Sequence, residues 1–213
     1  MTLLERDSRL RIARSITKSE ATGSLEIMQT LKRRAHAHEP PPIVSDGRSG
    51  CANAMIEVWG EIPPYKGVGP RPKYKAALPG WQHLRVIKKK DAKGHVERLE
   101  YRLEFGDDET LALLAQGTVH IERTHLTMRQ SNNRLVRKSL GFSKELSMHR
   151  YSAAWEDIVY NLIKPLKTLR IPDTSTSKRK WIPQTPAMKA GLSDHCWTFK
   201  ELLTVIPVPQ QYY

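Results

Sequence analysis

The sequence contains little cysteine and no long apolar run, and each shortage excludes a class of protein. Its two cysteines, Cys51 and Cys196, lie far apart and outside any CxxC spacing, which argues against a zinc knuckle and favours a reducing compartment. No segment approaches the roughly 20 apolar residues that cross a bilayer, and the N-terminus is too polar for a signal peptide. The histidines show neither HExxH nor HxxxH spacing, so a histidine zinc site is not expected. We therefore expect a cytoplasmic protein with no membrane association.

Acidic residues are also scarce relative to basic ones. The chain of 213 residues has 35 Lys and Arg against 22 Asp and Glu, which gives a formal net charge of +13 and an isoelectric point of about 9.9. This charge favours a polyanionic partner, with nucleic acid first and an anionic membrane second. A basic protein with no such partner is the plainer alternative. The length suffices for one domain with a buried core, plus extensions.

The charge imbalance is sharpest just after the middle of the chain. Glu122 is followed, up to Arg150, by seven Lys and Arg and by one acid, Glu145. Arg129 lies seven residues after Glu122, about two helical turns, so both side chains are expected on one helix face. One carboxylate within a cationic field suits a metal ion held beside a phosphate backbone. A surface acid and a solvated arginine are the plainer interpretations.

The order of periodic segments predicts an α/β domain on a mixed sheet with flanking helices. Asp46 follows a short apolar strand, where ligand sites of such folds gather, although a turn or N-cap role would also place an Asp there. In chain order, we expect a hairpin over 2–16 with its turn at Asp7-Ser8, a helix over 19–34, a strand at 43–44, a helix over 52–59, a strand pair over 81–88 and 96–105, a short helix over 111–116, and two long helices over 122–138 and 145–162. Ser143 is the expected N-cap of the last helix.

A long basic loop interrupts this pattern between residues 62 and 80. Prolines and glycines alternate there with cations and with Tyr65 and Tyr74, and compact domains rarely carry such a loop without a function. The tyrosines are candidates for stacking or groove contact with nucleic acid, whereas Trp155 and Tyr160 are expected in the core. Lys88, Lys89 and Lys90 indicate a solvated strand end or a DNA backbone contact. After Pro165 we expect a flexible basic tail, with an extended segment over 181–186 and a short element over 199–205.

Several segments resemble the InsB-type insertion-sequence transposases of bacteria. Ile121 to Gln130 and then Leu135 to Lys144 resemble the C-terminal signature of that family, and Val44-Ser45-Asp46-Gly47 resembles its second catalytic strand. Residues 181–203 resemble the tail of a subgroup of these proteins. The resemblance covers nearly the whole chain, and the block from Glu122 to Lys144 is its most specific part.

The resemblance implies a ribonuclease H-like fold in which an Asp-Asp-Glu set holds two divalent cations, Mg²⁺ or Mn²⁺. Asp46 matches the second aspartate and Glu122 the glutamate, which makes both of them metal ligands, and Arg129 matches the basic position two turns later. These three are the expected catalytic residues. Two such cations activate water or a 3′-hydroxyl and stabilise the leaving oxygen, so the implied reaction is phosphodiester hydrolysis at element ends followed by strand transfer.

The implied partners are double-stranded DNA, at element ends and target, and further copies of the chain in a synaptic complex, which would associate the protein with the nucleoid. The cations expected to contact DNA lie in the long loop and around the Glu122 segment. They are Lys66, Arg71, Lys73, Lys75, Arg123, Arg134, Arg137, Lys138 and Lys144. His125, one turn beyond Glu122, is expected beside the site or on the surface.

One departure from the family pattern limits the expected activity. The first aspartate of the family lies on the opening strand of the sheet, and the chain begins at what resembles the second strand; Asp7, in a hairpin turn, is not assigned this role. We therefore expect a partial catalytic domain over 1–165, with an insertion at about 62–105, a linker and tail over 166–213, and little or no activity alone. The alternatives are a non-enzymatic basic DNA-binding protein derived from a transposase and a different metal-dependent nuclease on the same fold.

Overall fold

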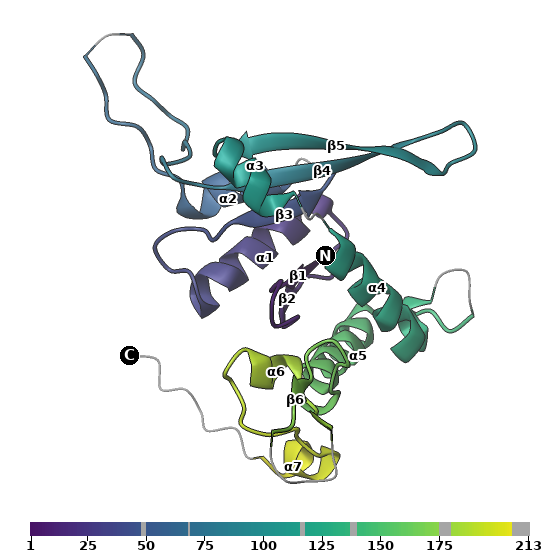
Figure 1. Cartoon of the computed structure of the whole chain (residues 1–213). Coiled ribbons are helices and arrows are strands. Elements are labelled where there is room, and N and C mark those ends of the chain that lie inside the picture. The colour runs from purple at the N-terminus through teal and green to yellow at the C-terminus, as the bar shows by residue number, and fades with distance from the viewer. Residues whose placement is uncertain (48–49, 68, 116–117, 137–139, 175–179, 206–213) are drawn as a thin grey trace. The chain divides into compact units, whose positions relative to one another are not determined.

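The chain forms two structural units, which are drawn in Figure 1. The computed structural model describes residues 1–47, 50–67, 69–115, 118–136, 140–174 and 180–205. The first unit contains residues 1–3 and 12–124, and the second contains residues 4–11 and 125–213. Within the described ranges, no helix combines the length and the apolar character that crossing a membrane requires.

A three-stranded mixed sheet lies at the centre of the first unit. Its strands are β3 (Ile43–Asp46), β4 (His83–Lys90) and β5 (Val96–Phe105), hydrogen-bonded in that order. β3 runs parallel to β4, and β5 runs antiparallel to β4. The predicted α/β class with a mixed sheet and flanking helices is confirmed at this level, and so is the predicted strand pair.

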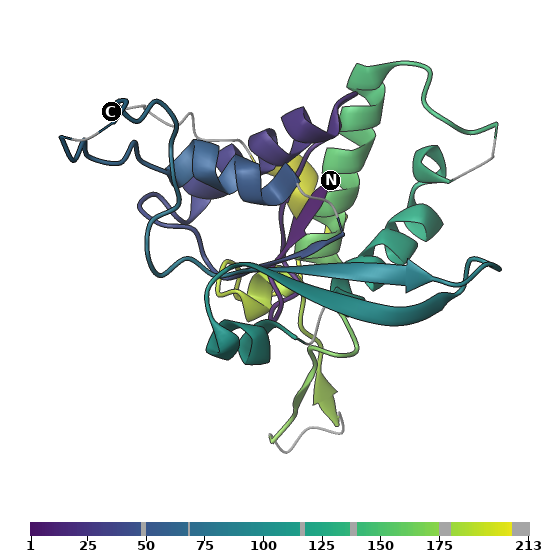
Figure 2. The same ribbon diagram turned by 90° about the horizontal axis from the view of Figure 1, so that it is seen from above.

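Helices cover both faces of this sheet. α1 (Glu20–Arg34) and α2 (Gly50–Trp59) lie on one side, and α3 (Asp108–Leu114) lies on the other (Figure 2). The hydroxyl of Ser19 caps α1 by accepting from the Thr22 backbone N–H, and three cations in its last turn complement the helix dipole. Buried side chains of α1, α2 and the sheet form one core, which includes Met28, Leu31, Ile43, Met55 and Trp59. All three helices were predicted, with ends displaced by at most three residues.

The N-terminal hairpin forms a separate two-stranded sheet. β1 (Thr2–Leu4) pairs with β2 (Arg11–Arg14), as predicted, and the turn falls at residues 6–8. The Glu5 carboxylate fixes this turn by accepting from the backbone N–H groups of Asp7 and Ser8, at 2.9 and 2.5 Å. Asp7 therefore lies in a turn, as expected.

The second unit is mainly helical and includes the C-terminal end of α4 (Val119–Ser131). Downstream of it lie the 3-10 turn η1 (Asn133–Leu135), α5 (Leu146–Ile158) and the π-helical turn η2 (Val159–Ile163). The short pair β6 (Ile171–Pro172) and β7 (Trp181–Ile182) precedes α6 (Pro186–Lys189) and α7 (Phe199–Thr204). Ala153, Tyr160, Leu169 and Ala187 are among its buried residues.

The first long helix ends earlier than predicted, whereas α5 and η2 together span residues 146–163, close to the predicted 145–162. α4 ends at Ser131 because Asn132 adopts an extended backbone and its side chain caps the following 3-10 turn by accepting from the Arg134 N–H. α5 begins at Leu146 with Glu145 in the N-cap position. The predicted cap, Ser143, instead accepts a hydrogen bond from the Arg134 guanidinium at 3.0 Å, so that prediction was wrong.

The segment after Pro165 contains more structure than the predicted tail. The extended segment at Trp181 and the short element near Phe199 are confirmed as β7 and α7, whereas β6 and α6 were not predicted. Thr185 is fully buried and caps α6 by accepting from the Met188 N–H at 3.2 Å. This cap and the proline at position 186 account for a helix turn that periodicity alone did not reveal.

Candidate carboxylate site and cationic surface

Asp46 and Glu122 are on the same face of the sheet. Asp46 is the last residue of β3 and pairs with Val86 in the parallel ladder. Because side chains alternate along a strand, Lys88 lies on the same face as Val86 and Asp46, two residues further along β4. The Lys88 ammonium forms an ion pair with the Glu122 carboxylate. Both acids therefore lie on the face that carries Val86, towards the carboxyl ends of the parallel strands.

Thr118 and Lys88 both contact the Glu122 carboxylate, which is also stabilised by its place in the helix. It lies in the first turn of α4, where the helix dipole favours a negative charge. Thr118 donates its hydroxyl to Glu122 Oε1 at 2.8 Å, and Lys88 contacts the same oxygen. From the sequence, Lys88 was predicted to lie at a solvated strand end or to contact DNA. The ion pair with Glu122 was missed, because no sequence pattern connects two residues that are 34 positions apart.

Asp46 and Glu122 supply ligands of the type that a hard divalent cation prefers, but two carboxylates do not complete its coordination. Carboxylate oxygens are the ligands that Mg²⁺ and Mn²⁺ prefer, and Asp46 and Glu122 are the residues that would hold such an ion. No group of three or more His, Cys, Asp or Glu side chains converges to a metal site anywhere in the described ranges. Lys88 also competes with a cation for Glu122. Two carboxylates beside an ammonium make a weaker site than three carboxylates would.

Arg129 belongs to a different structural unit from Asp46 and Glu122. It is half-buried in the last turn of α4 and belongs to the second unit, whereas Asp46 and Glu122 belong to the first. The expectation that Arg129 shares one helix with Glu122 is confirmed. His125, also on α4, is half-buried.

The cations of the long loop are at the surface, as a nucleic-acid contact requires. Lys66, Arg71 and Lys73 are exposed, and the Arg71 guanidinium lies 5.6 Å from the ring centre of Tyr65. Tyr74 is 85% exposed. Lys75 instead pairs with Glu57 at 3.3 Å, so its charge is partly neutralised.

The cations near the Glu122 segment are less uniform. Arg123 and Lys144 are exposed, whereas Arg134 is half-buried and bonded to Ser143. Arg137 and Lys138 lie outside the described residues. The exposed members of this group and of the loop are the ones that a phosphate backbone reaches most readily.

A buried polar pair lies on the opposite face of the sheet and was not found from the sequence. Ser45 Oγ lies 2.9 Å from Nε2 of His83, which has no solvent exposure. Burial lowers the pKa of His83 to about 4, so the imidazole is neutral at pH 7. Burial, with the nearby Asp46 charge, raises the pKa of the Cys51 thiol. A protonated, buried thiol is a poor nucleophile. We therefore interpret Cys51 as a core residue and not as a catalytic one.

No family model matches the chain, and neither a curated protein nor a solved structure matches it. The resemblance to InsB-type transposases therefore rests on the sequence segments quoted above.

Proposed function

We propose that this chain is the catalytic-domain portion of a DDE-type insertion-sequence transposase with a ribonuclease H-like fold. The observation that carries the proposal is the common face of Asp46 and Glu122 at the carboxyl ends of β3 and β4, with Lys88 paired to Glu122. These acids match the family pattern in type and order. Ligand sites in open α/β sheets gather at this end of the strands.

The complete reaction would cut the phosphodiester at element ends and join the 3′-hydroxyl to target DNA. Bound Mg²⁺ or Mn²⁺ supplies the activation of the attacking oxygen in this chemistry. Within the chain, Asp46 and Glu122 would hold the cation, and Arg129 would contact a phosphate. The sequence matches only two of the three acids of the family, so residues 1–213 alone bind DNA without completing strand transfer.

Double-stranded DNA is the proposed partner, bound with little sequence preference. The net charge of +13 and the exposed cations Lys66, Arg71 and Lys73 support this choice. Assembly of several copies on DNA, in association with the nucleoid, belongs to the same proposal.

The second candidate is a non-enzymatic DNA-binding protein derived from a transposase. The Lys88–Glu122 ion pair favours it, because a carboxylate neutralised by an ammonium no longer needs a metal ion. The two candidates differ in whether Asp46 and Glu122 still act together on a cation.

Mn²⁺ binding to the full chain, followed by the paramagnetic resonance signal of free Mn²⁺, tests the proposal. Lys88→Met removes the competing ammonium and is expected to tighten Mn²⁺ binding about 10-fold, whereas Lys89→Met, whose side chain pairs with Glu100 on the opposite face, is expected to leave it unchanged. Adding Asp46→Asn or Glu122→Gln to Lys88→Met should abolish the gain.

If Lys88→Met binds Mn²⁺ no better than Lys89→Met, or if Asp46→Asn leaves the gain intact, the two acids do not share a cation. DNA binding that persists in all these variants would then support the non-enzymatic candidate.

A further inference from the structure

A cleft in the second unit has the lining of a nucleotide site. It encloses about 410 Å³ between the end of α4, α5, η2 and α7, within the range of small-ligand pockets. Its walls combine three aromatic side chains, of which Trp155 and Phe199 are exposed, with two cations and several amides and hydroxyls. The residues that matter here are Asn132, Arg134, Trp155, Glu156, Lys164 and Phe199.

The aromatic pair of this cleft is exposed rather than buried. The rings of Trp155 and Phe199 lie 6.4 Å apart between centroids, with an interplanar angle of 28°. Trp155 is 43% exposed and Phe199 52% exposed, so the expectation that Trp155 belongs to the core was wrong, whereas Tyr160, 6% exposed, does belong to it. Two accessible aromatic faces at a cleft offer a platform on which a nucleobase can stack.

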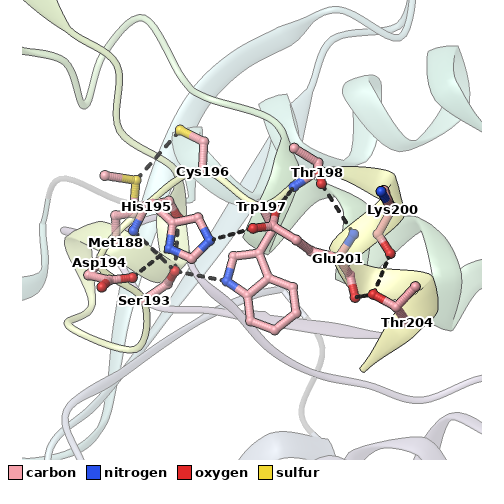
Figure 3. Close-up of polar contacts among 10 residues, drawn as sticks. All are labelled: Met188, Ser193, Asp194, His195, Cys196, Trp197, Thr198, Lys200, Glu201 and Thr204. Atoms are coloured by element: carbon pink, nitrogen blue, oxygen red, sulfur yellow. Dashed lines mark hydrogen bonds and ion pairs between the residues drawn. The ribbon is translucent and has the colours of Figure 1, made fainter. Parts of the chain in front are cut away.

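Phe199 is the first residue of α7, and residues on both sides of it form the polar contacts that Figure 3 shows. Thr198 and Glu201 form a capping box, in which each side chain accepts from the backbone N–H of the other residue, at 2.6 and 3.2 Å. His195 lies between Asp194, at 2.5 Å, and Glu201, at 3.3 Å. These contacts fix the start of the helix, so Phe199 presents its ring without a large ordering cost.

The charges of the cleft favour an anion. The lining acid Glu156 pairs with the buried Arg11 guanidinium at 2.6 Å, which also contacts Asp157 at 3.0 Å, and it accepts from Ser131 at 3.1 Å. Lys164 is exposed at the cleft, and Arg134 uses one of its guanidinium donors on Ser143. An ammonium and a guanidinium beside stacked aromatic rings match the phosphate and the base of one nucleotide.

The polar wall is ordered by its own hydrogen bonds. Asn132 donates to the Ser152 hydroxyl at 3.0 Å and accepts from the Arg134 backbone N–H at 3.0 Å. The same bonds that end α4 therefore hold the wall against α5, and the cleft is formed before a ligand arrives.

We propose that this cleft binds one unpaired nucleotide of a nucleic-acid strand, with its base stacked on Trp155 and Phe199 and its phosphate on Lys164 and Arg134. The inference rests on the proposed function only in taking nucleic acid as the ligand. It gives the protein a contact for single-stranded DNA that is distinct from the carboxylate site.

A single-stranded oligodeoxynucleotide carrying one 2-aminopurine tests the proposal, with the full chain in EDTA so that no metal contributes. Binding follows from anisotropy, and base stacking follows from quenching of 2-aminopurine. Trp155→Leu is expected to weaken binding roughly 5- to 100-fold and to remove the quenching, and Trp155→Phe to restore most of both. Lys164→Gln is expected to lower the slope of log affinity against log salt by about 0.7, whereas Lys167→Gln, three residues further on, should leave the slope unchanged.

Unchanged affinity and quenching in Trp155→Leu, with equal slopes for Lys164→Gln and Lys167→Gln, would overturn the proposal. Lys164→Gln alters an exposed side chain and decides the question even if Trp155→Leu does not fold. Because the assay excludes metal, loss of the carboxylate proposal leaves its result standing, and the reverse also holds.

Discussion

Burial fixes the protonation state of individual residues in this protein. His83 is enclosed by the sheet and by the ring of Phe105, whose centroid lies 6.1 Å from its own. The charges nearest to it, Arg85 and Glu104, act in opposite directions, so desolvation prevails and the imidazole stays neutral. A buried neutral histidine makes the free energy of unfolding depend on pH, because in acid the unfolded chain binds a proton that the folded chain does not bind.

The first prediction concerns this histidine. Since the folded pKa of about 4 lies below the ordinary value of 6.5, stability is present above pH 6.5 and is lost as the pH falls towards 4. Between pH 7 and pH 5, His83 is expected to remove about 2 kcal/mol from the free energy of unfolding. Urea titrations of wild type and His83→Gln at both pH values measure this. Equal losses in the two proteins would show that His83 is not the group responsible.

At the scale of elements, most of the helices and strands could be predicted from periodicity and caps. Ser19 and the cations at 32–34 mark both ends of α1, and the apolar run at Ile43 marks β3. The errors came from tertiary contacts. Asn132 ends α4 because Ser152 of α5 fixes its side chain, and a cap prediction at Ser143 failed because Arg134 takes that hydroxyl.

The candidate site was less accessible to prediction than the fold. The order of Asp46 and Glu122 is visible in the sequence, but the Lys88 contact depends on the pairing of β4 with β3. Likewise, the alternation of apolar residues around Trp155 does not tell a core position from a cleft wall, since both occupy an apolar helix face.

The second prediction concerns the attachment of the 4–11 segment to α5. Arg11 Nη1 lies 2.6 Å from Glu156 and 3.0 Å from Asp157, and its guanidinium carbon lies 3.6 Å from the ring centre of Tyr160. Arg11→Met is expected to cost about 3–5 kcal/mol, because it removes the buried guanidinium that offsets the charges of Glu156 and Asp157. Unfolding by guanidinium chloride measures this loss.

A matched control separates the buried pair from charge in general. Arg6→Met removes an exposed cation that lies 3.5 Å from Asp7, and it is expected to change stability by less than about 1 kcal/mol. Adding Glu156→Leu to Arg11→Met should recover part of the loss, since the more deeply buried of the two carboxylates is then removed together with the guanidinium. Equal effects of the Arg11 and Arg6 substitutions would contradict the assignment.

At the scale of the whole molecule, the excess of positive charge governs association with polyanions. Thirteen uncompensated charges attract DNA over about 10 Å at moderate ionic strength, before any specific contact forms. In the proposed complex with DNA, the exposed loop cations would add short-range contacts with phosphates.

The third prediction follows from these contacts. If Lys66, Arg71 and Lys73 each neutralise one phosphate, the slope of log affinity against log salt is expected to be about −2.7 or steeper. The affinity for DNA then falls about 40-fold between 50 and 200 mM salt. Replacing the three by Gln should reduce the slope by about that amount, measured by anisotropy with a random-sequence duplex. An affinity that does not respond to salt would exclude DNA as a partner bound through its phosphates.

The long loop is closed at its base by one pair of backbone hydrogen bonds, between Glu61 and Ala76, at 3.2 and 2.9 Å. The ends of the loop are thus pinned together independently of what lies between them. Doubling the length of such a closed loop costs only about 0.6 kcal/mol of closure entropy. An epitope or a fluorescent reporter inserted within the loop, between these two residues, is therefore expected to leave the structure of the sheet and its helices unchanged.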